Sequence, residues 1–168
     1  TALASEPADT DEFLVSDAGT LKRIDYSLIK GSGKILQVLQ DTSTTQIITT
    51  GTTFIAGGLS QAITPASTSN KIMIICSWVS SQINSGKNAV YTIFRDTTNL
   101  AGGDYDLARL RLDTTNTYVR QCITILDSPS STSEIVYTLQ FKGGESGGDC
   151  RVHPTDAKGS LVLMELAG

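Results

Sequence analysis

Two strong metal ligands lie close together near the end of the chain, in the segment Cys-Arg-Val-His at residues 150–153. The Cys150 thiolate and the His153 imidazole could both ligate zinc, and His153 is the only histidine in the sequence. A structural zinc site needs four protein ligands, so the others would have to come from Asp149, Asp156 or further copies of the chain. The sequence therefore favours no metal here.

Acidic side chains in loops are the second group with chemical capability. Asp104 and Asp106 flank Tyr105 beside a Gly-Gly pair, but the full spacing of a calcium-binding loop is absent. Hydrolysis of a glycosidic bond needs two carboxyl groups that face each other, and Glu145 and Asp149 are the other loop candidates. No spacing brings two of these carboxylates together, so we interpret them as solvated turns.

Motifs for nucleophilic catalysis and phosphate binding are incomplete. The single histidine would have to serve every serine or cysteine nucleophile, and no Gly-x-Ser-x-Gly elbow occurs. The Gly-Ser-Gly-Lys stretch at residues 31–34 lacks the spacing and the strand-to-helix context of a phosphate loop. The net charge of -4 and the pI of about 4.9 argue against a nucleic-acid partner. We expect no enzyme activity, no catalytic residues and no cofactor.

The composition describes a chain that can build one core. Its 168 residues suit a single compact domain with a short appendage. With 39% hydrophobic and 18% charged residues and a mean hydropathy of -0.02, it is typical of globular proteins. The longest apolar run, residues 72–79, is too short to cross a membrane, so no membrane insertion is expected. Three widely spaced cysteines, Cys76, Cys122 and Cys150, form no even disulfide framework, so we expect reduced thiols.

Short β-rich runs separated by turn residues fill the chain from residue 34 onward. The run at 71–79 is apolar on both parities, as expected for a central strand covered on both faces, and we expect its Trp78 in the core. The pattern predicts an all-β fold, an antiparallel β-sandwich or jelly-roll-like domain. The predicted strands are residues 34–40, 45–49, 52–55, 59–64, 71–79, 88–95, 107–112, 117–126, 134–142 and 161–166.

A separate N-terminal unit of residues 1–33, a hairpin and linker, is predicted to precede the sandwich domain of residues 34–168. Its expected parts are strands at 11–17 and 20–25 around an Ala18-Gly19 turn, a helical turn at 26–30 and a hinge at 31–33. An isolated hairpin is marginally stable in water, so its apolar side chains need cover from other subunits. The predicted attachment or oligomer interface is Phe13, Leu14, Val15, Leu21 and Ile24.

The sequence of residues 11–25, DEFLVSDAGTLKRID, resembles a linker of phage tail-fibre and virion structural proteins, in which it commonly precedes a terminal β domain. The rest of the chain is similar to that terminal domain at residues 34–38 (KILQV), 91–100 (YTIFRDTTNL) and 126–129 (LDSP), and in its short apolar last strand. The resemblance implies location in a virion, a homotrimer, and loops that vary with the host or with the decorated lattice. It carries no catalytic signature.

Two functions follow from these observations. The first is a tail-fibre or receptor-binding module whose residues 96–105 and 143–153 touch a host glycan or protein. The second is a capsid decoration or cement protein whose hairpin and trimer base grip the shell. A chain that starts at Thr1 fits the second if it is whole and the first if it is cut from a longer fibre. The fibre is favoured because the hairpin phrase most often sits inside fibres, and a carbohydrate-active tailspike fragment is a minor alternative.

The expected partners are further copies of the chain, other virion proteins of the fibre, baseplate or capsid, and the host surface. The candidate contact residues in exposed loops are Asp96, Asn99, Asp104, Tyr105, Tyr118, Glu145, Arg151 and His153.

Overall fold

The computed structural model of the chain describes residues 7–8, 10–29, 34–82, 87–102, 106–111, 117–145 and 149–168. The chain divides into two compact units, Thr1–Lys34 and Ile35–Gly168. The hinge predicted at residues 31–33 lies outside the described residues.

The first unit is a β-hairpin followed by one helical turn. Strands β1 (Glu12–Asp17) and β2 (Thr20–Asp25) pair antiparallel, and α1 (Tyr26–Ile29) follows directly. The turn residues Ala18 and Gly19 both have positive φ, 50° and 84°, as a tight two-residue hairpin turn requires. The predicted hairpin is therefore confirmed, because its signals, a local turn and alternating side chains, need no tertiary context.

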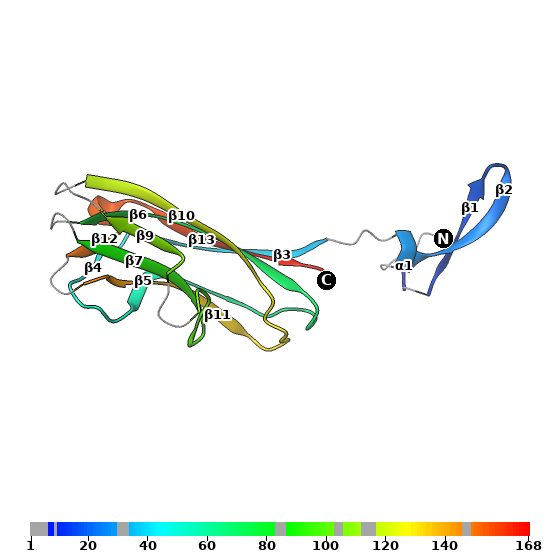
Figure 1. Ribbon diagram of the computed structural model, residues 1–168. Coiled ribbons are helices and arrows are strands. Elements are labelled where there is room, and N and C mark those ends of the chain that lie inside the picture. The colour runs from blue at the N-terminus through cyan, green and yellow to red at the C-terminus, as the bar shows by residue number, and fades with distance from the viewer. Residues whose placement is uncertain are drawn as a thin grey trace. The chain divides into compact units, whose positions relative to one another are not determined.

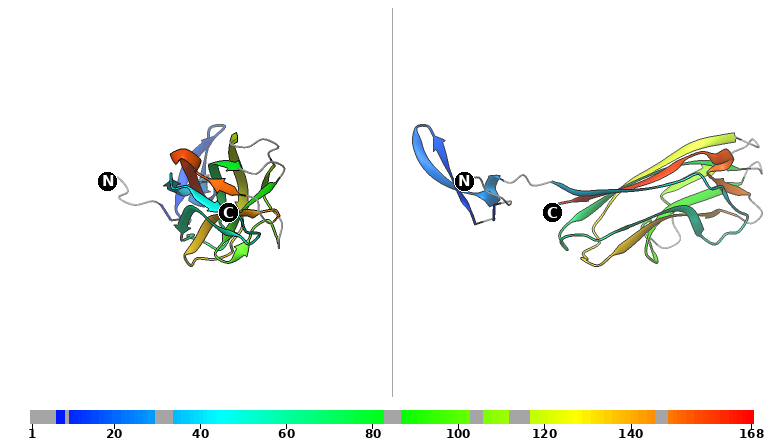
Figure 2. Two further views of the ribbon diagram at one scale, coloured as in Figure 1. Left: turned by 90° about the vertical axis from the view of Figure 1, so that its left-hand side faces the viewer. Right: turned by 180° about the vertical axis from the view of Figure 1, so that it is seen from behind.

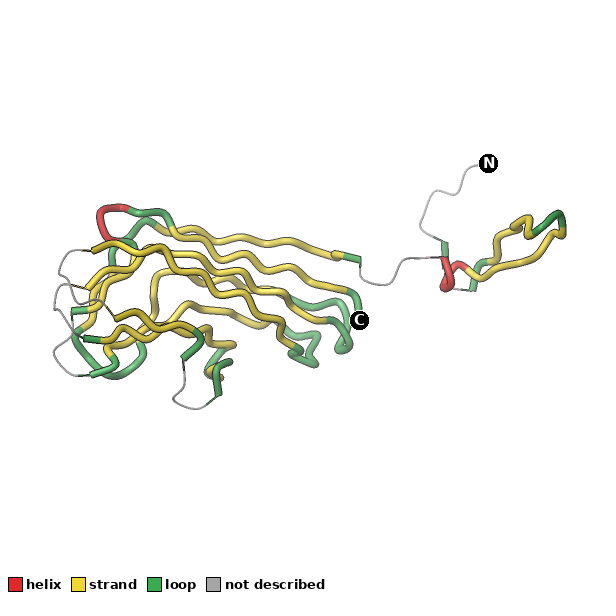
Figure 3. The backbone as a smooth tube through the Cα atoms, turned by 45° about the horizontal axis from the view of Figure 1, so that its top comes forward, coloured by secondary structure: helices red, strands yellow, loops and turns green. Residues whose placement is uncertain are grey.

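The second unit is an antiparallel β-sandwich, as predicted, and its strands run lengthwise in two layers (Figures 1, 2 and 3). The strands of the first sheet are β3 (Ile35–Ser43), β4 (Ile47–Thr49), β6 (Lys71–Gln82), β10 (Thr117–Asp127), β12 (Cys150–Val152) and β13 (Gly159–Leu166). Within it, β13 and β12 pair with successive parts of β6, and β10 also pairs with β6. β3 and β4 pair with β13 and β12 respectively.

The second sheet has the order β5-β11-β7, with β8 and β9 pairing with different parts of β7. Its strands are β5 (Ile55–Ile63), β7 (Asn88–Arg95), β8 (Thr98–Asn99), β9 (Ala108–Arg111) and β11 (Ile135–Gly143). A short 3-10 turn, η1 (Pro154–Asp156), connects β12 to β13 in the first sheet. No helix in the described part of the chain is long and apolar enough to span a membrane.

The core lies between the two sheets and is centred on aromatic side chains. Trp78 of β6 packs against Tyr91 of β7, with ring centroids 5.1 Å apart, and Tyr91 stacks on Phe141 of β11 at 6.1 Å. All three side chains are fully buried, which confirms the expectation that Trp78 belongs to the core. Burial of such large apolar surfaces is the main stabilisation of a two-layer β fold.

Strand β6 departs from the prediction that both of its faces are covered. The side chains at 72, 74, 76 and 78 are fully buried, while those at 73, 75, 77 and 79 are partly exposed. Within one chain, therefore, only one face of β6 is fully buried, although apolar residues lie on both faces of the strand.

The strand predicted at residues 52–55 is wrong. Residues 51–53 form a bend, and β5 starts only at Ile55. The bend is held by the Gly143 N–H, which donates to the Gly51 carbonyl at 2.8 Å. β5 then runs through Gly57-Gly58, which lie between the predicted strands 52–55 and 59–64, with a shift in its register to β11 at this point. Gly58 has φ of 78°, which a β-bulge accommodates.

The connection from β12 to β13 packs a histidine into the structure. His153 is fully buried in the left-handed conformation at φ 52°, and its Nε2 lies 3.0 Å from the Gly57 carbonyl oxygen of the opposite sheet. Gly159 at the start of β13 lies against the ring, so a Cβ there would be 2.1 Å from His153 Cε1. The buried ring therefore requires glycine at this position.

Substitution Gly159→Ala is expected to lower the free energy of unfolding by roughly 1–3 kcal/mol, because the added methyl overlaps a buried ring that cannot move aside. Gly51→Ala is the matched control, since a Cβ there has its nearest neighbour at 3.6 Å and should cost less than about 0.5 kcal/mol. Urea unfolding followed by tryptophan fluorescence measures both. Equal stability of the two variants would contradict the close contact.

Candidate interaction surfaces

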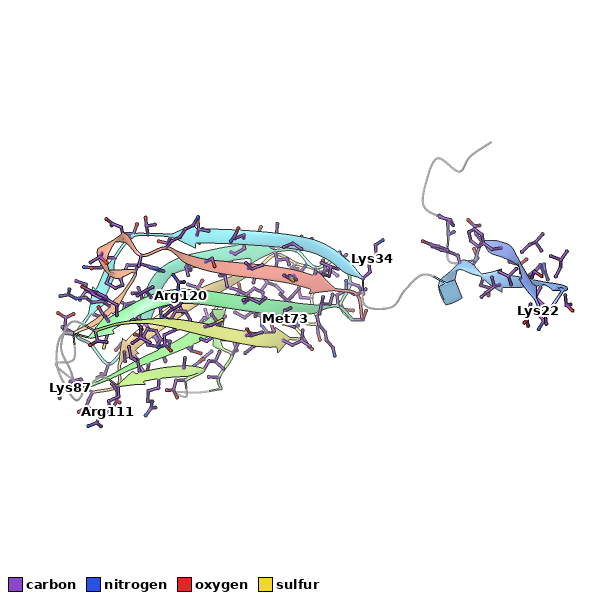
Figure 4. The ribbon with its side chains drawn as sticks, turned by 90° about the horizontal axis from the view of Figure 1, so that it is seen from above. Lys22, Lys34, Met73, Lys87, Arg111 and Arg120 are labelled. Atoms are coloured by element: carbon purple, nitrogen blue, oxygen red, sulfur yellow. The ribbon has the colours of Figure 1, made fainter. Side chains whose placement is uncertain are left out.

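The outer face of the first sheet carries an apolar row that crosses four strands. Leu126 of β10, Met73 of β6, Met164 of β13 and Val38 of β3 are direct cross-strand neighbours, and we call these four residues the outer row. Leu126 is 50% exposed and Val38 55% exposed. Figure 4 looks onto this face, with β3, β13, β6 and β10 side by side and Met73 labelled. Met73 and Met164 between them are half-buried, so the outer row is an apolar stripe with exposed ends on the outer face of the larger sheet.

The apolar character of this face changes along the strands. The row next to the outer row still contains Ile75 and Val162, while the following one contains Ser77 and Ser160. Here the guanidinium of Arg120 donates to Ser77 Oγ at 2.9 Å, and Figure 4 places Arg120 farther along the sheet than Met73. The face is therefore apolar at the end where β3 begins and polar toward the other end.

The hairpin unit divides the five predicted interface residues between its two faces. Phe13 and Ile24 are cross-strand partners and are half-buried, and the Phe13 ring lies 5.9 Å from that of Tyr26. Leu14 and Leu21 are each 72% exposed, and Val15 is also exposed at 36%. The two leucines point to the face that this unit leaves uncovered.

A hollow of about 400 Å³ lies on the outer face of the second sheet, where β5 begins. It is lined by Thr52, Thr53, Phe54, Phe94, Gln140 and Lys142. Phe54 and Phe94 meet edge to face at 5.6 Å, and Lys142 Nζ lies 4.3 Å from the Phe54 ring centroid. None of these six residues was among the contact residues predicted from the sequence, although the alternation of Gln140 and Lys142 with apolar neighbours is a signal that indicates an outward position.

The predicted contact residues that the structure describes are dispersed. Asp96 is exposed in the β7–β8 turn, where its side chain accepts from Val136 N at 2.9 Å. Asn99 is half-buried in β8 and accepts from Thr92 Oγ1 at 2.6 Å. Tyr118 is 54% exposed on β10. Asp104 and Tyr105 lie outside the described residues.

Two further contact candidates are tied to neighbouring charges. Glu145 is exposed and pairs with Lys87 at 3.3 Å, and the half-buried Arg151 pairs with Asp149 at 3.1 Å. These carboxylates of Glu145 and Asp149 were also candidates for glycosidic chemistry. Each of these two carboxylates forms an ion pair with a basic side chain, whereas glycosidic hydrolysis would require each to face a second carboxyl group.

His153 was expected in an exposed contact loop, and this is wrong because the side chain is fully buried. Burial lowers the pKa of His153, although backbone contacts to Gly57 and Ala157 oppose the shift. Cys150 is buried too, with its Sγ 3.6 Å from the Asn88 carbonyl oxygen. Across the described ranges, no three His, Cys, Asp or Glu side chains gather as a metal site would require.

Perturbed ionisable groups often mark functional sites, but here they hold loops and sheets together. Glu165 of β13 is 1% exposed and accepts three hydrogen bonds, from Gln37 Nε2 at 2.6 Å, Ala66 N at 2.7 Å and Asn70 Nδ2 at 2.6 Å. Burial alone would raise the pKa of Glu165, but these donors outweigh it and hold the pKa below its usual value. The carboxylate thus fastens residues 66–70 to the first sheet.

A second polar cluster joins the two sheets. Arg95 Nη1 donates to both carboxylate oxygens of Asp127 on β10, at 3.0 and 2.9 Å. The Tyr137 hydroxyl donates to the same carboxylate at 2.7 Å. Burial, and then the hydrogen bond to Asp127, raise the pKa of Tyr137. Because Arg95 and Tyr137 belong to the second sheet, the cluster is a cross-sheet clamp.

Comparison with known proteins finds a likeness of fold only. No family model matches the chain, and no curated protein matches it in sequence. A structure of infectious bursal disease virus, Gx strain, aligns over 90% of this chain and 40% of its own at 18% identity and a TM-score of 0.50. The Gt strain structure aligns over 90% and 41% at 15% identity and 0.47, and a VP2 subviral particle over 95% and 43% at 15% identity and 0.43. The chain thus spans less than half of these viral chains.

Glu165→Gln is expected to reduce the dependence of the free energy of unfolding on pH in the acidic range. A carboxyl with a depressed folded pKa stabilises the fold above its unfolded pKa, and that contribution is lost as pH falls through the folded value. The wild type should therefore lose stability as pH drops below the ordinary value of 4.5. At neutral pH the variant should be roughly 1.5–3 kcal/mol less stable, since it loses hydrogen bonds to a charged group.

Urea unfolding at a series of pH values measures this effect. The exposed residue change Glu145→Gln serves as the control and should leave the profile close to that of the wild type. A Glu165→Gln variant with the same acid slope as the wild type would show that this carboxylate does not stabilise the fold.

Proposed function

We propose that this chain is a non-enzymatic structural protein of a virion, and that it acts as a homotrimeric tail-fibre or receptor-binding module of a bacteriophage. The observation that carries the proposal is the outer row, in which Leu126, Met73, Met164 and Val38 form an apolar stripe across one face of the sandwich. Proteins that remain monomeric rarely expose a contiguous apolar stripe of this kind.

Self-association would bury the partly exposed outer face of the first sheet. Strand β6 carries apolar side chains on both of its faces, yet only one face is fully buried within the chain. Identical subunits around a closed symmetry axis could each bury this face, and the exposed leucines at 14 and 21 of the hairpin offer a second apolar surface. Three copies would also multiply weak contacts with a host surface through avidity.

The fold likeness supports a place in a virus particle. The Gx strain structure of infectious bursal disease virus shares the arrangement of the sandwich at a TM-score of 0.50. The non-enzymatic assignment is supported by the ion pairs of two candidate carboxylates, Glu145 with Lys87 and Asp149 with Arg151. The same likeness favours capsid decoration as the alternative, in which the chain would stabilise a shell.

A trimer of mass three times 17.8 kDa is expected when the purified chain is measured by light scattering. Val38→Lys with Leu126→Lys should convert it to monomers, because like charges in the outer row cannot be buried without cost. Both side chains are at least half exposed, so the monomer should still fold. Ile48→Lys, 44% exposed on β4, is the matched control and should leave the trimer intact.

Co-sedimentation of the same sample with host cells and with emptied capsids separates the two functions. A trimer that pellets with cells supports the fibre module, and one that pellets only with capsids makes decoration the function. A stable monomer that binds neither would refute both.

A further inference from the structure

We propose that the hollow on the outer face of the second sheet binds a carboxylated sugar residue of a surface glycan. The proposal rests on the proposed function, because it names the chemistry that such a module would recognise. The hollow is separate from the outer row, which lies on the other sheet, so both surfaces can be occupied in one assembly.

The hollow is held open by contacts of its own backbone. The bend that carries Thr52 and Thr53 is fixed at its start, where Gly51 N donates to Thr49 Oγ1 at 3.2 Å and the Gly51 carbonyl accepts from Gly143 N at 2.8 Å. The far wall consists of residues in the paired strands β7 and β11. A site built on paired strands loses little conformational entropy when a ligand binds.

The lining residues match the mixed surface of a sugar. Phe54 and Phe94 offer apolar rings, against which the C–H face of a pyranose can pack. The hydroxyls of Thr52 and Thr53 and the amide of Gln140 can both donate and accept, as a ring of sugar hydroxyls requires. The volume of about 400 Å³ falls within the range of small-molecule sites, about 300–1,000 Å³.

Lys142 favours a negatively charged ligand. Its ammonium lies over the Phe54 ring, a cation–π contact that positions the charge at the hollow. In the described part of the chain no carboxylate forms an ion pair with it, whereas Lys22 pairs with Asp17 and Lys87 with Glu145. An ammonium that pairs with no carboxylate among the described residues, and that lies beside hydroxyl and amide groups, favours a carboxylate on the ligand.

The same six residues argue against other ligand chemistries. They include one cation, and the chain has a net charge of -4, so a phosphate backbone would find no continuous basic surface. They contain neither a carboxylate nor a histidine, so the hollow is equipped to hold a sugar and not to cleave it. Asn99, a predicted contact residue, pairs with Phe94 across β7 and β8 and so lies beside the hollow.

Ligand-observed saturation-transfer NMR on the full chain tests the proposal, with glucuronate, glucose and acetate as probes in the millimolar range. Glucuronate should give the strongest signal, glucose a weaker one and acetate none. No signal from glucuronate, or equal signals from acetate and glucuronate, would overturn the proposal, because the first shows no sugar site and the second a mere anion site.

Variants assign the signal to the hollow. Lys142→Gln should weaken glucuronate binding about tenfold, to the level of glucose, and Phe94→Ala should abolish binding of both sugars. Lys158→Gln removes an exposed lysine outside the hollow and should change nothing. The melting temperature of each variant shows whether it is folded. If Phe94→Ala unfolds, Lys142→Gln still tests the proposal, because Lys142 lies on the outer face of β11 and outside the core. Unchanged binding in Lys142→Gln would overturn the proposal.

The two proposals can fail separately. A trimer that pellets with cells yet gives no sugar signal would leave the proposed function standing and remove the sugar site. Sugar binding by a chain that stays monomeric and pellets with neither cells nor capsids would do the reverse.

Discussion

The pleat of β6 is the constraint on which the rest of the structure depends. Its alternation sends Ile72, Ile74, Cys76 and Trp78 into the core and leaves the side chains between them on the outside. The register of β10 and β13 against β6 extends this division across the sheet. A slip of one residue would exchange the two faces. The same strand therefore specifies both the packed interior and the surface offered to other chains.

The parts of the fold that could be predicted are those with local signals. The hairpin follows from Ala18-Gly19 between alternating strands, and the sandwich follows from evenly spaced β-rich runs. The course of β5 through Gly57 could not be predicted, because glycine pairs usually mark breaks. Its reason is tertiary, since a Cβ at Gly57 would lie 3.0 Å from the Leu139 side chain.

The candidate sites were less accessible from the sequence, because each combines distant segments. Phe54, Phe94 and Lys142 come from three separate stretches and meet only through the pairing of β11 with β5 and β7. His153 had the polar neighbours of a loop, yet the Gly57 carbonyl and the bare backbone of Gly159 create a buried place for its ring. Polar surroundings in sequence thus did not predict exposure in space.

The position of β13 between β3 and β6 has a consequence for how the protein is made. β3 and β6 are separated by more than twenty residues in sequence, and β13, the strand that lies between them in the sheet, is synthesised last of the three. During synthesis, the nascent chain must carry the apolar strand β6 without its central partner, a state prone to aggregation. The first sheet can therefore be completed only after residues 159–166 have been synthesised, and the exposed strand β6 most needs protection from aggregation in the interval before that.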